Sequence, residues 1–352
     1  MIELRSYQAA AIDALFDYWA GGGGNPLVEM ATGTGKSLVI AELVRRLSDE
    51  FPAMRVLMLV HVRELVEQNF KALLNLYPGA SIGIYSAGLG HRDAHHRITY
   101  ASVQSVFRKA AVLGERDLVV VDEAHLVPAA GEGMYLKLLE GLRRMRPDLR
   151  VAGFTATPYR LDSGRLDGGT GLFDETVYTY GIAQGIEDGY LSPLISKATA
   201  AQVDVSGVAR RGGEFVAGSL EVAADRITAE AVDEIIRFGE ARRAWLVFCS
   251  GVGHAQRVRD ALRARGVAAE MVTGETPTHE RDRIFCAYRA GQIRALTGAN
   301  VFTTGFDAPV VDLVAMLRPT LSTSLYVQMV GRGTRLSTGK ENCLVLDFAG
   351  NV

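Results

Sequence analysis

The sequence is poor in cysteine and has no long apolar run. Its three cysteines, Cys249, Cys286 and Cys343, lie far apart, and no Cys-x-x-Cys pair occurs. A zinc finger within this chain is therefore not expected, and the thiols are expected to be reduced and buried. No window reaches the roughly 18 uncharged apolar residues of a membrane helix. The N-terminus carries Glu3 and Arg5 and has no apolar signal core. We expect a cytoplasmic protein without membrane association.

The sequence also lacks a strong charge of either sign. Its formal net charge is −2, so the total charge gives no basic signature of nucleic-acid binding. Such binding would have to come from local grooves, or from backbone amides and hydroxyls that contact phosphates. The 352 residues, of which 48% are hydrophobic, are ordinary for a globular protein with one large or two smaller domains. We expect a monomer.

Short apolar or β-branched runs alternate with helical patterns in two separate stretches. This alternation predicts an α/β fold with parallel sheets whose faces are covered, in two copies. We expect a first domain at 1–190, a linker of irregular structure at 191–235 and a second domain at 236–352. The strands are expected at Pro26–Met30, Arg55–His61, Arg97–Ala101, Asp117–Asp122, Arg150–Thr155, Ala244–Cys249, Ala268–Val272, Ile293–Thr297, Val311–Leu317 and Asn342–Phe348. Helices are expected at Val62–Leu76, Met134–Met145, Gly253–Arg265, Thr278–Ala290 and Thr323–Arg335.

A glycine-rich loop follows the first predicted strand. Residues 30–37 read Met-Ala-Thr-Gly-Thr-Gly-Lys-Ser and precede a helix-like segment. Gly33 and Gly35 allow the backbone to curl so that successive N–H groups point at phosphate oxygens. Lys36 can then reach the outer phosphates, and the hydroxyl of Ser37 can hold Mg²⁺. Met30 stands where the usual pattern has glycine, so the match is partial and a chance glycine loop is the alternative.

Two further strand ends carry polar side chains. Asp122, Glu123 and His125 follow an apolar strand, and in a parallel sheet this end faces the ligand crevice. Asp122 could hold Mg²⁺ and Glu123 could polarise an attacking water, whereas an exposed acidic strand end is the alternative. The segment Phe154–Pro158 supplies hydroxyls that could connect a hydrolysis site to a second surface, or it is a Thr/Pro turn.

A cationic motif lies near the end of the chain. Gln328, Arg332 and Arg335 fall at i, i+4 and i+7 of the predicted helix Thr323–Arg335, so they are expected to share one face. A solvated face is the alternative. Two fixed guanidiniums, however, suit a phosphoryl transition state approached from across a cleft. The segment Thr303–Asp307 follows a strand and could touch a ribose or Arg332.

These motifs, in this order, resemble the motif set of superfamily 2 helicases of the Asp-Glu-Ala-His type. The resemblance runs from Leu4–Gln8 to Arg335, and several details are similar to the RadD branch of bacterial DNA-repair helicases. Those details are the segments His61–Val66, Ser102–Val106, Thr303–Pro309 and Val330–Gly333. The resemblance implies two tandem RecA-like domains with ATP and Mg²⁺ in the interdomain cleft.

The resemblance also implies residue roles. The catalytic residues would be Lys36, Asp122, Glu123, Arg332 and Arg335, the two arginines acting as fingers from the second domain. ATP would be bound by Arg5, Gln8, Thr32, Gly33, Thr34, Gly35, Lys36, Ser37, Gly305 and Asp307, and Mg²⁺ by Ser37 and Asp122. Coupling of hydrolysis to strand binding would fall to His125, Thr155, Thr157 and Gln328. Strand contacts would come from Arg63, Ser102, Gln104, Ser250, Thr273, Gly274 and Thr304, although a turn or helix-cap role fits Ser102 and Ser250 equally well.

The resulting expectation is an ATP-driven helicase or translocase on nucleic acid, with DNA preferred, acting in repair or recombination with repair proteins as partners. An RNA helicase or RNP remodeller is one alternative, and an ATP-gated DNA clamp with little unwinding is another. The RadD branch carries a C-terminal extension with clustered cysteines, whereas this sequence stops at Val352. The chain is therefore expected to be either truncated or a minimal member, which leaves zinc and partner binding open.

Overall fold

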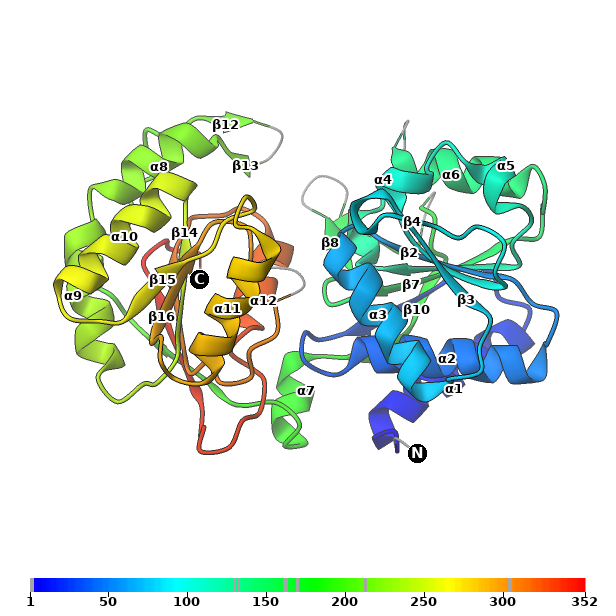
Figure 1. The fold of residues 1–352 in the computed structure, drawn as a ribbon, viewed down its shortest axis with the longest axis horizontal. Coiled ribbons are helices and arrows are strands. Elements are labelled where there is room, and N and C mark those ends of the chain that lie inside the picture. Colours follow the sequence, from blue (N-terminus) through cyan, green and yellow to red (C-terminus); the bar gives the residue numbers. More distant parts are fainter. Residues whose placement is uncertain are drawn as a thin grey trace. The chain divides into compact units, whose positions relative to one another are not determined.

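The computed structural model describes residues 3–129, 131, 133–160, 164–168, 171–211, 214–302 and 306–351. It divides into two compact units, Met1–Gly181 and Ile182–Val352, and each is built around its own sheet (Figure 1). The loop residues Thr304 and Gly305, predicted to contact the strand and ATP, lie outside the described residues. Among the described residues, no helix has the length and apolarity that crossing a membrane requires.

The first domain contains an eight-stranded sheet in the order β10-β1-β7-β6-β2-β5-β3-β4, parallel except for β4. Its strands are β1 (Pro26–Met30), β2 (Val56–Val60), β3 (Ile82–Ser86), β4 (His91–Arg92), β5 (Ile98–Ser102), β6 (Leu118–Asp122), β7 (Arg150–Thr155) and β10 (Glu175–Tyr180); β8 (Tyr159–Arg160) and β9 (Gly164–Arg165) form a separate hairpin. Its helices are α1 (Ser6–Ala20), α2 (Lys36–Glu50), α3 (Arg63–Leu76), α4 (Val103–Val106), α5 (Ala110–Leu113) and α6 (Met134–Arg143), with short 3₁₀ turns at Ala87–Leu89 and Ala124–Leu126.

Helices cover the faces of this sheet. Val119 and Val121 of β6 pack into one cluster with Leu138 and Leu142 of α6, so α6 covers that face. The central strands β2 and β6 are buried at every position, as expected for parallel strands with both faces covered. This burial is why continuous apolar runs, without alternation, mark these strands in the sequence.

The second domain contains a six-stranded, wholly parallel sheet in the order β11-β18-β17-β14-β16-β15. Its strands are β11 (Leu194–Lys197), β14 (Trp245–Cys249), β15 (Ala269–Met271), β16 (Ala295–Gly298), β17 (Leu313–Leu317) and β18 (Cys343–Asp347), and β12 (Arg210–Arg211) pairs with β13 (Glu214–Phe215). Its helices are α7 (Ile182–Glu187), α8 (Ala217–Asp225), α9 (Thr228–Gly239), α10 (Val252–Ala264), α11 (Thr278–Arg289) and α12 (Thr323–Val330). Alternate residues of β14 join two different clusters, Val247 with helices α9 and α10, and Phe248 with α11 and α12.

Every strand that the sequence predicts is present, with ends that agree to within two residues. Two predictions differ from the structure. The segment 191–235 is not irregular, because it contributes β11 to the second sheet beside β18 and also contains α8 and the start of α9; the units divide after Gly181. The last predicted helix is too long, because α12 ends at Val330 and the chain then turns through Gly331 and Gly333.

Arg116 anchors one edge of the first domain in an unusual way. The side chain is fully buried, and its guanidinium donates to the backbone carbonyls of Ala94, His96 and Leu113, among others. Burial lowers the pKa of Arg116 to about 10. The cation therefore joins the loop before β5 to the end of α5, and no carboxylate of the described residues lies at hydrogen-bond distance from it.

We predict that Arg116→Met lowers the free energy of unfolding of the first domain by about 3 kcal/mol, because several buried carbonyls lose their donor. Urea denaturation would measure the change with Trp19 as the reporter, in a Trp245→Phe background. Arg150→Met is the matched control, since Arg150 is exposed at the start of β7, and we expect a change within about 0.5 kcal/mol. Equal losses in the two variants would show that Arg116 contributes no more than a surface arginine.

Candidate active site

The glycine loop between β1 and α2 has the backbone geometry that the sequence predicts. Gly33 and Gly35 have φ values of 91° and 81°, in the left-handed region that glycine adopts without strain. A Cβ on Gly35 would also lie 2.6 Å from Nε2 of Gln8, so a side chain there would be strained by the backbone conformation and would displace the Gln8 amide. Helix α2 begins at Lys36, and its N-terminal N–H groups therefore open at the loop.

The N-terminal segment holds this loop. Gln8 is buried, donates from Nε2 to the carbonyl of Thr34 at 3.0 Å and accepts from the N–H of Arg5 at 3.0 Å. Tyr7 donates to the same carbonyl at 2.8 Å and stacks on Tyr180, with ring centroids 4.0 Å apart. Neither tyrosine belongs to a phosphate-binding pattern, so no signal in the sequence pointed to them.

The other loop residues divide into backbone and side-chain roles. The Thr34 hydroxyl donates to the carbonyl of Ala31 at 2.7 Å, so this side chain shapes the loop. Thr32 lies in the turn itself, and Ser37 lies in the first turn of α2. The ATP-binding role expected of Gln8 and Arg5 stays a prediction, since here the side-chain amide of Gln8 bonds to the loop.

Lys36 faces the two acids that follow β6. Its Nζ lies 3.4 Å from Oε1 of Glu123 and 3.7 Å from Oδ1 of Asp122, and all three side chains are largely buried. Burial alone would lower the pKa of Lys36, but the carboxylates of Glu123 and Asp122 raise it above the ordinary lysine value. Burial raises the pKa of Asp122, and Lys36 opposes that shift. One cation therefore faces two acidic groups at the edge of the sheet where the parallel strands have their carboxyl ends.

Asp122 has a further partner that the sequence analysis missed. Asn69 of α3 donates from Nδ2 to Oδ2 of Asp122 at 3.0 Å and is buried. Oδ1 of Asp122 accepts from the N–H of Glu123 at 3.0 Å. Glu123 itself has a φ of 56°, a left-handed conformation that is uncommon for a residue with a side chain and turns its carboxylate back toward Lys36.

Glu123, His125, Thr155 and Thr157 form a connected polar group. Nδ1 of His125 lies 3.1 Å from Oγ1 of Thr155 and 3.4 Å from Oε2 of Glu123. The Thr155 hydroxyl donates to the carbonyl of Thr157 and accepts from its N–H. Because that hydroxyl proton points at Thr157, the proton between His125 and Thr155 belongs on Nδ1, where Glu123 can share it. The two strand ends predicted separately are thus brought together, since β6 and β7 are neighbours.

The second-domain motif is arranged differently from the prediction. Gln328 lies on α12, but Arg332 and Arg335 follow the helix in a series of tight turns, so the predicted common helical face does not exist. Arg332 is buried and donates to the carbonyl of Phe306 at 2.7 Å. Arg335 pairs with the carboxylate of Asp307, and burial lowers its pKa. Both arginines therefore contact the segment after Gly305.

Three of the predicted strand contacts lie at the carboxyl edge of the first sheet. Arg63 begins α3, and its half-exposed side chain pairs with Glu64. Nε2 of Gln104 lies 3.3 Å from Nδ1 of His61. Ser102 precedes α4 but does not cap it with its side chain, which instead contacts the hydroxyls of Ser86 and Ser105.

The predicted contacts of the second domain are more structural in character. The Ser250 hydroxyl donates to the carbonyl of Leu317 at 2.8 Å, and Thr273 caps the turn that contains Gly274 by accepting from the N–H of Glu275. Their side chains have local roles in this structure, and their contacts to a strand stay predictions.

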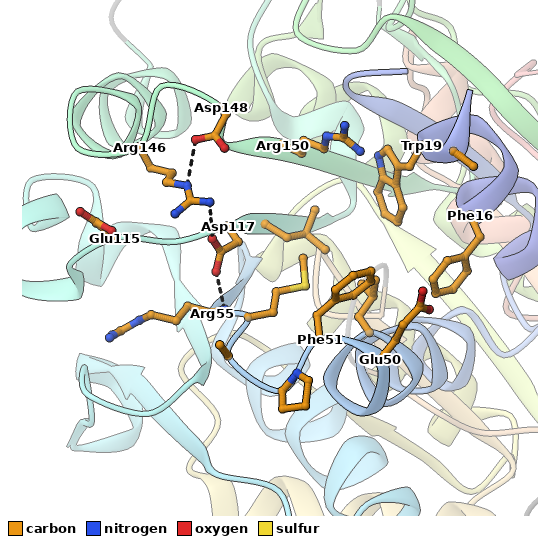
Figure 2. A pocket seen from close by; sticks show the side chains of 16 residues that line it. Phe16, Trp19, Glu50, Phe51, Arg55, Glu115, Asp117, Arg146, Asp148 and Arg150 are labelled. Carbon is orange, nitrogen blue, oxygen red and sulfur yellow. Dashed lines mark hydrogen bonds and ion pairs between the residues drawn. The ribbon is translucent and has the colours of Figure 1, made fainter. Parts of the chain in front are cut away.

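A hollow of about 950 Å³ in the first domain lies away from this site. Figure 2 shows Trp19 and Phe51 on one side and Arg146 with Asp117 and Asp148 on the other. Arg55, Asp117 and Arg150 stand at the amino ends of β2, β6 and β7, whereas the glycine loop and the acids stand at carboxyl ends. Since these strands are parallel, the hollow lies at the opposite edge of the sheet from the candidate active site.

Mg²⁺ would find few protein ligands here. No group of three or more His, Cys, Asp or Glu side chains that could cage a metal ion occurs within the described ranges. Ser37 and Asp122 offer one hydroxyl and one carboxylate, a set that fits an ion which keeps several waters and shares its remaining coordination with substrate phosphates.

Comparisons with known proteins agree with this geometry. Residues 1–160 match the family model of the type III restriction enzyme res subunit, and residues 228–337 match that of the helicase conserved C-terminal domain. Together these two models match the two domains of a superfamily 2 helicase. The predicted superfamily and the predicted enzyme class, an ATP hydrolase dependent on nucleic acid, are thereby confirmed.

The chain is 29% identical over 367 residues to the putative ATP-dependent helicase IRC3 of Saccharomyces cerevisiae. The alignment covers 99% of this chain but 51% of the yeast protein, so the chain spans about half the length of that relative. The fragment structure of a putative HsdR subunit of a type I restriction enzyme from Vibrio vulnificus YJ016 is similar with a TM-score of 0.74 at 24% identity, covering 99% of this chain and 64% of that one. The type ISP restriction-modification enzyme LlaBIII bound to DNA is similar with a TM-score of 0.71 at 15% identity, covering 99% of this chain and 28% of that one. The predicted fold of tandem RecA-like α/β domains is confirmed.

We predict that Lys36→Met lowers the free energy of unfolding of the nucleotide-free first domain by about 2 kcal/mol, because two buried acids lose their shared cation. Adding Glu123→Gln should restore part of this loss, since one of the two charges is then removed. Urea denaturation followed through Trp19, again with Trp245→Phe, would measure Lys36→Met, Glu123→Gln and the double variant. Strictly additive losses would mean that Lys36 and Glu123 do not interact energetically.

Proposed function

We propose that this chain is an ATP-driven motor that moves along nucleic acid, with DNA preferred, and works in repair or recombination as the RadD branch does. The observation that carries the proposal is the cluster of Lys36, Asp122 and Glu123 beneath a glycine loop, extended by His125 and Thr155 toward a second loop. A nucleotide-binding scaffold without turnover would need the glycine loop and Lys36. It would not need an acid that is placed for proton transfer and connected through His125 and Thr155 to a second loop.

In this proposal the loop amides and Lys36 would hold the phosphates of ATP. Ser37 and Asp122 would hold Mg²⁺, which would supply positive charge beside the phosphates. Glu123 takes a proton from the attacking water. The oxygen of that water bonds to the γ-phosphorus, and the bond between the γ-phosphorus and the β–γ bridging oxygen breaks. Lys36 exchanges its present carboxylate partners for phosphate oxygens. That exchange leaves Glu123 free of its cation and therefore a better base.

Coupling to the strand follows from the same edge of the sheet. Ser102 ends β5, and Arg63 and Gln104 follow β2 and β5, whose carboxyl ends lie at the edge that carries the acids. We propose that these residues hold phosphates of the strand, which makes the grip largely independent of sequence. The preference for DNA is supported by the names of relatives, because the family of the first domain is that of a restriction enzyme subunit and LlaBIII was solved bound to DNA.

The direct test is steady-state ATPase activity with no nucleic acid, single-stranded DNA, duplex DNA and RNA in turn. We expect single-stranded DNA to raise kcat by about tenfold or more. We expect Glu123→Gln to bind ATP while losing at least about 99% of turnover, since general-base catalysis contributes roughly 10²–10⁴-fold. Stimulation by RNA alone would replace the DNA motor with an RNA helicase. Tight ATP-gated binding with slow, unstimulated turnover would instead support a DNA clamp.

A second prediction concerns the arginines of the second domain, which we propose act as fingers on the transferring phosphate. Arg335→Ala should lower kcat about 10³-fold while changing the KM for ATP less than about threefold, because the charge is needed mainly in the transition state. Arg289→Ala is the matched control, since Arg289 is a nearby cation that donates to the carbonyl of Asp307. A pure rise in KM for Arg335→Ala would contradict the finger role.

A further inference from the structure

Asn69 is a polar residue on an otherwise apolar stripe of α3. The buried residues of this helix are Leu65, Val66, Asn69 and Leu73, so Asn69 lies between two leucines at spacings of four residues. It is 1% exposed. A leucine at this position would complete the apolar stripe, so the packing of the helix does not explain an amide side chain here.

The amide of Asn69 is only half used by the protein. Its Nδ2 donates to Oδ2 of Asp122 at 3.0 Å, whereas its buried Oδ1 has no hydrogen-bond partner among the described residues. A buried acceptor without a partner destabilises a fold. The contact with Asp122 is therefore the one contribution of this side chain that distinguishes it from an apolar residue.

That contact fixes how the Asp122 carboxylate is turned. Oδ2 is held by Asn69, while Oδ1 accepts from the N–H of Glu123 and lies 3.7 Å from Lys36. With one oxygen tied to α3, the other is directed toward the glycine loop, where Mg²⁺ and phosphates would be bound. Without Asn69 the carboxylate could rotate about its terminal bond.

The same helix begins at a predicted strand contact. Arg63 is the first residue of α3, and Asn69 follows six residues later, roughly 9 Å along the axis of an α-helix. Helix α3 packs on α2, which begins at Lys36. A shift of α3 at the end that carries Arg63 would therefore be transmitted along the helix to Asp122.

We infer that Asn69 is a positioning residue that orients Asp122 for Mg²⁺–nucleotide and connects it to strand engagement at the start of α3. The inference rests on the proposed function for its strand-coupling part. Outer-shell partners of this kind change metal affinity or activity by roughly 10–100-fold when they are removed.

The test uses Asn69→Leu in the full chain, with Val66→Ala as the control for loosened packing of α3. The affinity for a fluorescent ADP analogue is measured with Mg²⁺ and in EDTA, together with thermal unfolding and stimulation of the ATPase by single-stranded DNA. For Asn69→Leu we expect the affinity for the ADP analogue to be unchanged in EDTA and to rise about tenfold less than in the wild-type protein when Mg²⁺ is added. We also expect weaker stimulation of the ATPase by DNA and an unchanged or higher Tm. For Val66→Ala we expect a lower Tm with the Mg²⁺ gain and the stimulation intact.

Asn69→Leu could gain as much nucleotide affinity on adding Mg²⁺ as the wild-type protein and show the same stimulation of its ATPase by single-stranded DNA. That result would overturn the inference and leave the proposed function standing. If wild-type protein is not stimulated by any strand, the proposed function fails, and the Mg²⁺-dependent affinity still decides whether Asn69 positions Asp122. Asn69→Ala provides a second variant if leucine lowers the Tm; the same loss of the Mg²⁺ gain is expected, and retention of the full gain would contradict the inference.

Discussion

A buried lysine between two acids is the interaction on which the chemistry of the first domain depends. Lys36 begins α2 directly after the glycine loop that follows β1, and Asp122 and Glu123 lie at the end of β6. The strands β1 and β6 are separated in the sheet by β7. The three residues meet because all three strands are parallel and end at one edge. With one cation and two acidic groups in little water, the cluster favours an added divalent cation, and phosphates compete with the acids for Lys36.

Two routes lead away from this cluster through specific contacts. On one side Asn69 connects Asp122 to α3, and on the other His125 and Thr155 connect Glu123 to the loop after β7. Both acids face Lys36, but Asp122 is also held by fixed donors on both oxygens, whereas Glu123 also contacts a histidine. Such a division suits one acid for a fixed ligand role and the other for moving a proton.

The second domain keeps its arginines engaged internally. Arg332 donates to the carbonyl of Phe306 and Arg335 pairs with Asp307, so both guanidiniums are directed by one short segment after β16. A finger role would require Arg335 to exchange a carboxylate for phosphate oxygens, which a guanidinium can also bind through two N–H groups. That requirement makes the Asp307 pairing a resting contact in the proposed cycle.

The sequence by itself determined the central strands, the glycine loop and the order of the motifs. Strands such as β2 and β6 are apolar at every position because both their faces are covered, and Gly33 and Gly35 are needed wherever the backbone adopts a positive φ. Edge strands such as β10 and β11 escaped prediction, since their half-exposed residues give weak patterns. Only the tertiary structure decided that Arg332 and Arg335 leave the helix, and that Asn69 meets Asp122 across 53 residues of sequence. Such contacts depend on how separate elements pack, and no local spacing records that packing.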